Sequence, residues 1–127
     1  MVPMLIALLL AAATGEPPAT ARWRACVDRT STNSEWAECG AAYVREADTA
    51  LNAEWKRLMA TVGGQTRTEL VAEERAWIAY RAAACRFLAT GDFGREGEVL
   101  HYPSCVADVI QRRTADLAGY RAFAAPR

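Results

Sequence analysis

The chain has 127 residues, which is enough for one ordinary domain and too few for two. Hydrophobic residues make up 52% of it and charged residues 24%, a balance that favours a packed core over intrinsic disorder. The formal net charge is zero, so the composition lacks the basic surplus that is typical of proteins that bind nucleic acid.

An apolar segment, MLIALLLAAA, occupies residues 4–13. It is too short to span a bilayer and has the length of the apolar part of a signal peptide, although no basic residue precedes it. The alternative is a buried N-terminal helix, but Pro17 and Pro18 would separate such a helix from the rest of the chain. The segment therefore predicts a periplasmic or secreted protein.

Small residues permit cleavage of this signal peptide after Ala13, Gly15 or Ala21. We assign residues 1–21 to the signal peptide and residues 22–127 to the exported domain. No cysteine lies at a cleavage point, so the sequence predicts no lipid anchor and no other stable membrane anchor once the signal is removed.

Four cysteines, Cys26, Cys39, Cys85 and Cys105, follow the signal. An even number of cysteines in an oxidising compartment predicts two disulfide bonds, and the spacing does not match a zinc site. Four cysteines allow three pairings, and the residues alone do not select one. We expect Cys26–Cys39 and Cys85–Cys105, because these partners are nearest in sequence.

A short segment at residues 22–31 is expected to lead into a long helix, because Thr32 and Glu35 form a capping box, T-x-x-E. Gly63 and Gly64 are expected to end that helix. Its apolar residues recur at intervals of three and four, as one face of a helix requires. They are Trp36, Gly40, Tyr43, Val44, Ala47, Leu51, Trp55, Leu58 and Val62.

A second capping box, Thr66 with Glu69, predicts another helix. Residues 91–103 contain three glycines and a proline, so a loop is expected there. Ser104 is expected to cap a third helix, whose apolar residues as far as Tyr120 face inward. No segment alternates long enough to predict a strand. The predicted fold is all-α, a small antiparallel bundle of about three main helices stapled by two disulfides.

Charged and polar residues interrupt the apolar faces of all three predicted helices. Because an unpaired buried charge is too costly to keep, we expect them to pair, with arginine stacking on Trp77. A hydrolase that uses Asp48 and Glu74 is the less favoured alternative, since structural ion pairs are the commoner source of such clusters. The expected structural ion network contains Asp48, Asn52, Glu74, Arg81 and Arg113.

No familiar catalytic or cofactor-binding motif is present in the sequence. The P-loop, GxGxxG and HExxH patterns are absent, and His101, the only histidine, cannot hold a metal ion alone. We therefore expect a protein that is not an enzyme and has no catalytic residues, no metal site and no cofactor.

Three stretches of the chain resemble the N-terminal domain of the LprI-like lysozyme inhibitors. They are ADTALNAEW at residues 47–55, ERAWIAYRAAAC at residues 74–85, and Cys105 followed by RTADL at residues 113–117. The chain departs from the family pattern at Glu74, where glutamine is usual, but the scaffold residues remain. The resemblance implies an exported helical domain, and it implies lysozyme inhibition as the activity of some members.

This resemblance makes a lysozyme inhibitor the leading functional prediction, with lysozyme or another peptidoglycan hydrolase as partner. Such an enzyme works with two carboxylates in a cleft, and a rigid loop that fills the cleft would block it sterically. We expect residues 91–103 to form that loop, although a merely solvated connection is the alternative. The expected partner-binding residues are Phe93, Arg95, His101 and Tyr102. The alternative function is a cell-envelope interaction module with no lysozyme target.

Overall fold

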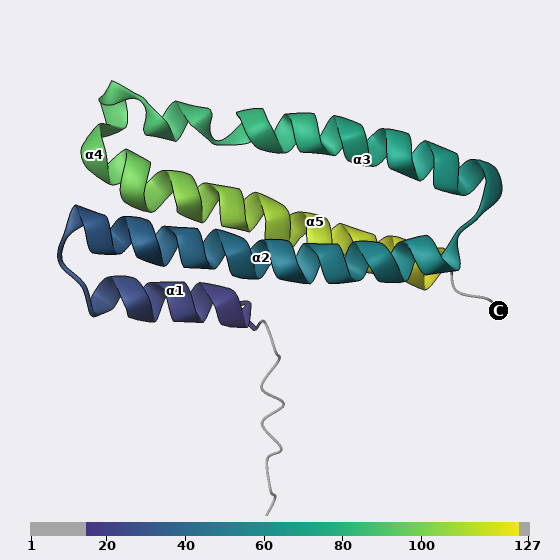
Figure 1. Cartoon of the computed structure of the whole chain (residues 1–127), viewed down its shortest axis with the longest axis horizontal. Helices are drawn as coiled ribbons and strands as arrows, with labels where there is room; N and C mark the ends of the chain where they lie inside the picture. The colour runs from purple at the N-terminus through teal and green to yellow at the C-terminus, as the bar shows by residue number, and fades with distance from the viewer. Residues whose placement is uncertain (1–14, 125–127) are drawn as a thin grey trace, which may run out of the picture.

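The computed structural model describes residues 15–124. The apolar segment at residues 4–13 and the possible cleavage point after Ala13 lie outside this range. The described chain is helical and contains no strand, which confirms the predicted all-α fold (Figure 1). Its four long helices are α1 (Pro18–Asp28), α2 (Asn33–Thr61), α3 (Gly64–Ala84) and α5 (Tyr102–Ala124).

Long helices that follow one another in the chain run in opposite directions, so α2 and α5 run parallel to each other (Figure 1). The α2–α5 pair is the most extensively packed pair of the molecule. Helix α1 lies along α2 on one side of this pair, and α3 lies on the other side (Figure 1). The bundle therefore has a central pair of helices and two flanking ones.

Helix α1 is the element that the sequence analysis does not predict, because residues 22–31 are expected to be only a short lead-in segment. Pro18 stands in its first turn, where proline is favourable because that position has no helical partner for a backbone N–H. None of its residues is fully buried, so its apolar pattern is weak. The possible cleavage point after Ala21 falls inside this helix.

The core lies between α2 and α5 and is built from small and branched side chains. A buried alanine from each helix, Ala47 and Ala107, lets the two backbones approach closely. Gly40 serves the same purpose, because a Cβ placed on it would lie 2.7 Å from the Cβ of Pro103. The remaining core residues are Tyr43, Leu51, Leu58, Ile110 and Leu117.

The predicted end of α2 at Gly63 and Gly64 agrees with the structure, and one of the three predicted N-terminal caps does. Thr32 is confirmed as the cap of α2, because its Oγ1 accepts a hydrogen bond from the backbone N–H of Glu35 at 3.2 Å; the Glu35 side chain accepts from Thr32 Oγ1 at 2.8 Å. The other two predicted caps are wrong, since Thr66 lies inside α3 and Ser104 lies inside α5. Helix α3 instead begins at Gly64, whose φ of +55° reverses the chain directly after α2.

Residues 86–101 form consecutive short helical turns, so the predicted irregular loop is wrong. Helix α3 ends at Ala84, and the turns η1 (Arg86–Ala89), η2 (Gly91–Phe93), α4 (Gly94–Glu96) and η3 (Gly97–His101) lead straight into α5. One of the three glycines that suggested a loop, Gly97, permits close packing instead. A Cβ on Gly97 would clash with the carbonyl oxygen of Leu88, so η3 can lie directly against η1.

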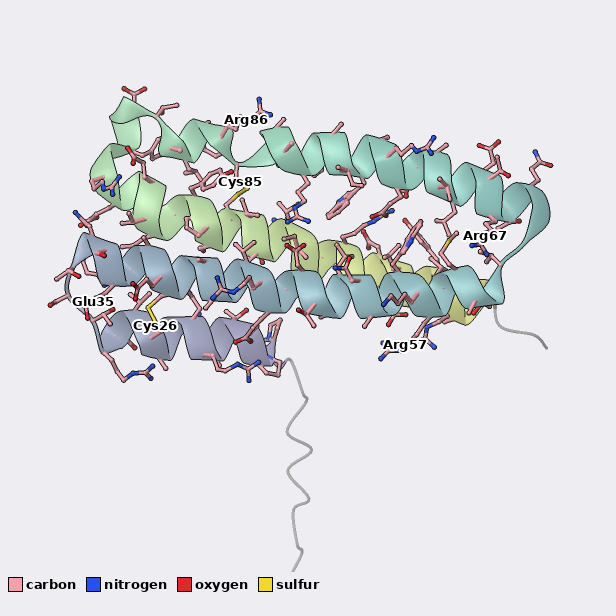
Figure 2. The ribbon with its side chains drawn as sticks, viewed as in Figure 1. Cys26, Glu35, Arg57, Arg67, Cys85 and Arg86 are labelled. Carbon is pink, nitrogen blue, oxygen red and sulfur yellow. A yellow bond between two sulfur atoms is a disulfide. The ribbon has the colours of Figure 1, made fainter. Side chains whose placement is uncertain are left out.

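Two disulfide bonds join cysteines that are neighbours in sequence, and this confirms the expected pairing (Figure 2). Cys26–Cys39 ties α1 to α2 with a Cα–Cα distance of 5.8 Å, and Cys85–Cys105 ties the end of α3 to α5 at 5.9 Å. Both distances are ordinary for disulfides. The second bond closes the segment of short turns at its base.

Candidate functional site

Arg81 and Asp48 form a two-pronged ion pair between α3 and α2. Arg81 Nη1 donates to Asp48 Oδ1 at 2.7 Å, and Nη2 donates to Oδ2 at 2.9 Å. The side chains are 27% and 33% exposed, so water and salt reach the pair. The fork geometry fixes the spacing of the two helices.

Arg113 of α5 forms the more deeply buried ion pair, with two consecutive glutamates of α3. Its side chain is 3% exposed and donates to Glu74 Oε2 from Nη2 at 2.5 Å and to Glu73 Oε2 from Nη1 at 2.5 Å. Burial alone would lower the pKa of Arg113, but the hydrogen bonds to both carboxylates outweigh it and raise that pKa. The guanidinium therefore stays charged and ties α3 to α5.

One aromatic ring serves both arginines. The guanidinium carbon of Arg81 lies 5.9 Å from the centre of the Trp77 ring, and that of Arg113 lies 5.3 Å from it. Both distances are in the range of cation–π contacts. Trp77 thus supplies apolar area and a π face between two cations, which is why α3 carries tryptophan and arginine on the same face.

Asn52, which the sequence analysis places in the ion network, is exposed and lies outside these ion pairs. A residue that the analysis missed, Glu54, is buried instead. Glu54 Oε1 accepts from Arg121 Nε at 2.6 Å, and its Oε2 accepts from Arg57 Nη1 at 3.0 Å. The signal was available in the sequence, because Glu54 stands three residues after Leu51 and four before Leu58 on the apolar face of α2.

The ion pairs explain how α3 is held. Asp48 and Glu74 belong to different pairs, and each is already engaged by an arginine. Within residues 15–124, no group of three His, Cys, Asp or Glu side chains could hold a metal ion. The physical role of these charges is to fix α3 against α2 and α5.

The predicted partner-binding residues lie at the end of the bundle formed by the short turns, but they do not share one face. Phe93 is 45% exposed and meets Phe87 edge to face, with 5.8 Å between the ring centres. Arg95 is exposed and pairs with Glu98 in the next turn. His101 is also exposed.

Two separate hollows flank the start of α5 and divide this set. Phe93 and His101 line one hollow of about 520 Å³, together with residues of α1 and α2. Tyr102 lines a different hollow of about 540 Å³, which it shares with Arg81 and Gly40. The structure therefore brings Phe93 and His101 together and places Tyr102, which is only partly exposed, elsewhere.

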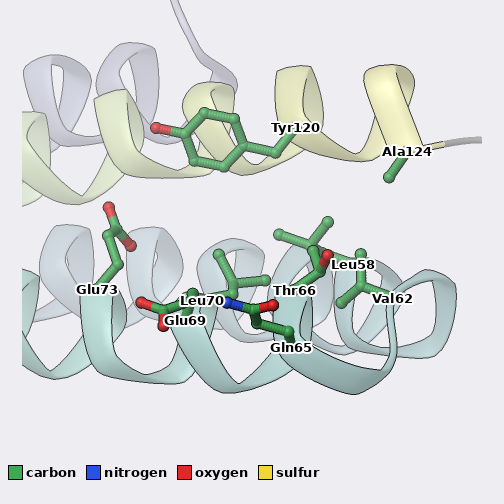
Figure 3. Close-up of a pocket in the computed structure, with 9 residues that line it drawn as sticks. All are labelled: Leu58, Val62, Gln65, Thr66, Glu69, Leu70, Glu73, Tyr120 and Ala124. Atoms are coloured by element: carbon green, nitrogen blue, oxygen red, sulfur yellow. The ribbon is translucent and has the colours of Figure 1, made fainter.

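A third hollow, which the sequence analysis did not identify, opens between α3 and α5 at the opposite end of the bundle (Figure 3). Its volume is about 530 Å³, and Leu58, Val62 and Leu70 supply apolar lining. Tyr120 faces α3 across it in Figure 3 and is 41% exposed, so the predicted inward position of this ring is only half correct. The hollow marks where α3 and α5 diverge.

No helix within residues 15–124 is long and apolar enough to cross a membrane. A family model described as "Lysozyme inhibitor LprI" matches residues 26–117, which include all four cysteines and every ion pair that holds α3. No curated protein and no solved structure matches the chain. The match spans most of the sequence, and the chain belongs to the LprI family of lysozyme inhibitors.

Proposed function

We propose that this protein is exported and inhibits a lysozyme-like glycosidase by blocking its cleft, with no covalent chemistry. Membership of the LprI family supports lysozyme, or another peptidoglycan hydrolase, as the partner. Two disulfides among four cysteines support an oxidising compartment, because such bonds rarely persist in a reducing cytoplasm. The periplasm and the exterior of the cell are the compartments where such enzymes act.

The observation that carries the mechanism is the disulfide-closed end of the bundle. Residues 86–101 are fixed at their base by Cys85–Cys105 and internally by the close packing of Gly97. A rigid segment loses little conformational entropy when it enters a cleft, so its exposed side chains can contribute to affinity. Phe93 offers an apolar contact, and Arg95 offers a cation for the carboxylates of a glycosidase cleft.

The test is inhibition of lysozyme-driven lysis of cell walls by the purified exported domain. Phe93→Ala, Arg95→Ala and His101→Ala are expected to weaken inhibition by about tenfold or more, because hot-spot contacts dominate interface energies. Their melting temperatures should stay close to that of the parent protein, because these side chains are exposed. Phe123→Ala is the matched control, since Phe123 is 87% exposed on the last helix, outside the disulfide-closed end.

Tyr102→Ala separates this mechanism from a general loss of structure. Tyr102 is partly buried, so its removal should lower the melting temperature before it lowers inhibition. Inhibition that survives all three changes at exposed residues would move the site to another face. A folded protein that inhibits no lysozyme of the c, g or i type would favour an envelope interaction module.

A further inference from the structure

The hollow beside α1 is lined by residues of α1, α2, the short turns and α5. Its volume of about 520 Å³ lies within the range of about 300–1,000 Å³ usual for small-molecule sites. Trp23 comes from α1, Leu88 and Phe93 from the short turns, and Ser104 and Asp108 from α5. Aromatic rings and polar side chains therefore line the same concave surface.

The aromatic part of this hollow is fixed in advance. The Trp23 ring stacks on Tyr43 with 5.3 Å between ring centres and 23° between planes. The Tyr43 hydroxyl, in turn, is hydrogen bonded to Thr20 Oγ1 at 2.7 Å. Phe93 is held from outside by Phe87. Two aromatic rings from distant parts of the sequence thus line the hollow without needing to be ordered by a ligand.

The polar part carries no net charge. Arg24 is paired with Glu16 at 2.5 Å, and Asp108 is paired with Arg112 at 2.9 Å, so the cation and the anion of the lining are each compensated. The Ser104 hydroxyl can donate and accept a hydrogen bond, while the Asp108 carboxylate accepts. A strongly charged ligand finds no surplus of opposite charge in the lining. A neutral ligand with hydroxyl groups and an apolar face finds both kinds of partner.

From this chemistry we infer that the hollow beside α1 binds a neutral sugar ring of a glycan. A pyranose has an apolar C–H face, which fits against Trp23 or Phe93, and a rim of hydroxyls, which can donate to Asp108 and exchange hydrogen bonds with Ser104. The hollow shares Phe93 and His101 with the proposed partner-binding residues, but the sugar site is tested without a lysozyme. The lining residues from α1, such as Trp23, come before residue 26, where the family match begins. Part of the site therefore lies outside the matched region.

The experiment is a titration of the oxidised full-length chain with tri-N-acetylchitotriose, followed by ¹H–¹⁵N NMR. We expect saturable shifts at residues of the hollow, including Trp23, Phe93 and Asp108. Phe93→Ala and Asp108→Ala should each weaken binding at least tenfold. The matched controls, Phe123→Ala and Asp116→Ala, change an exposed aromatic and an exposed acid outside the hollow and should alter the dissociation constant less than twofold.

Three results would overturn the inference. One is the absence of saturable shifts at millimolar sugar, and another is a set of shifts that maps to a different face. The third is equal affinity for the hollow variants and the control variants, all shown to be folded by their melting curves. Because lysozyme is absent from the titration, failure here leaves the proposed inhibition untouched, and failed inhibition leaves the sugar site standing.

Discussion

The central α2–α5 pair and the flanking helix α3 are held by opposite physical means. Between α2 and α5 most contacts are apolar, apart from the Glu54–Arg121 ion pair, and small residues such as Ala47 and Ala107 let the backbones come close. Helix α3 contains no fully buried residue and reaches the pair through long side chains, chiefly Trp77, Arg81 and the glutamates that bind Arg113.

This difference predicts that the α2–α5 pair is the stable part of the bundle and that α3 opens more easily. Salt does not screen the burial of apolar surface, whereas it does screen ion pairs that water reaches. Helix α3 is therefore the long helix expected to open first, between its glycine turn at one end and the Cys85–Cys105 bond at the other. The α2–α5 pair should remain intact while it does so.

The largest expected effect tests the apolar half of this comparison. Ile110 is fully buried between the central helices, so Ile110→Ala should lower the free energy of unfolding by about 2–5 kcal/mol. Urea denaturation followed by circular dichroism measures it. Ile78→Ala is the control, because Ile78 is exposed on α3 and should cost less than about 0.5 kcal/mol. Equal losses would contradict a core centred on α2 and α5.

The next effect tests the ionic half, and two adjacent arginines provide the contrast. Arg113→Ala leaves Glu74 partly buried without its partner, so we expect a loss of about 3 kcal/mol. Arg112→Ala removes an exposed surface pair and should cost less than about 1 kcal/mol.

Amide hydrogen exchange shows where the Arg113 change acts. Protection should fall throughout α3 in the Arg113 variant and remain near normal in the core of α2. Protection lost evenly from all helices would mean that α3 is not a separately held element.

The pH dependence of stability tests the ion pair that lies between the central helices, Glu54 with Arg121. The hydrogen bond from Arg121 is the main reason that the pKa of Glu54 lies below its usual range; burial opposes it and Arg57 assists it. A lowered folded-state pKa adds stability above the unfolded value of about 4.3, and this is lost as the pH falls through the folded pKa.

Glu54→Gln should therefore lower stability at pH 7, by about 1–2 kcal/mol. The gap between parent and variant should narrow as the pH falls below about 4.3 and close below the lowered folded-state pKa of Glu54, where both side chains are neutral. Urea denaturation at a series of pH values gives the two curves. Parallel curves across this range would show that the Glu54 carboxylate does not carry the effect.

The smallest effect extends the comparison to α1. Thr20→Val removes the hydrogen bond to Tyr43 and should cost about 1 kcal/mol. This hydrogen bond argues against ending the signal peptide at residue 21, because cleavage after Ala21 would remove Thr20 and the first turn of α1, so we now expect cleavage after Ala13 or Gly15. The intact mass of the exported protein decides this. A mature chain that begins at Arg22 would show that this turn is dispensable.

The sequence was sufficient for features that depend on neighbouring residues. The start of α2 follows from the contact of Thr32 with Glu35, and its end follows from two glycines. The disulfide pairing follows from proximity along the chain. Arg81 meets Asp48 because both occupy apolar faces where an unpaired charge would be costly.

Features that depend on distant parts of the chain were missed. Gly97 resembles a loop residue, but η1 packs against it and requires the absence of a Cβ. Ser104 resembles a cap, but the turn η3 runs directly into α5 and supplies the preceding helical backbone. Helix α1 gains its stability from α2 and from Cys39, neither of which shows in its own weak pattern. The hollow beside α1 was hidden for the same reason.

The disulfide connectivity also has a consequence for the order of oxidative folding. Each cysteine bonds the one next to it in sequence, Cys26 with Cys39 and Cys85 with Cys105. In a chain that crosses a membrane from its N-terminus, the first pair emerges and can be oxidised before the second pair is available. Pairing in order of appearance then gives the native bonds directly. Maturation should need a thiol oxidant but no isomerase to correct mispaired intermediates.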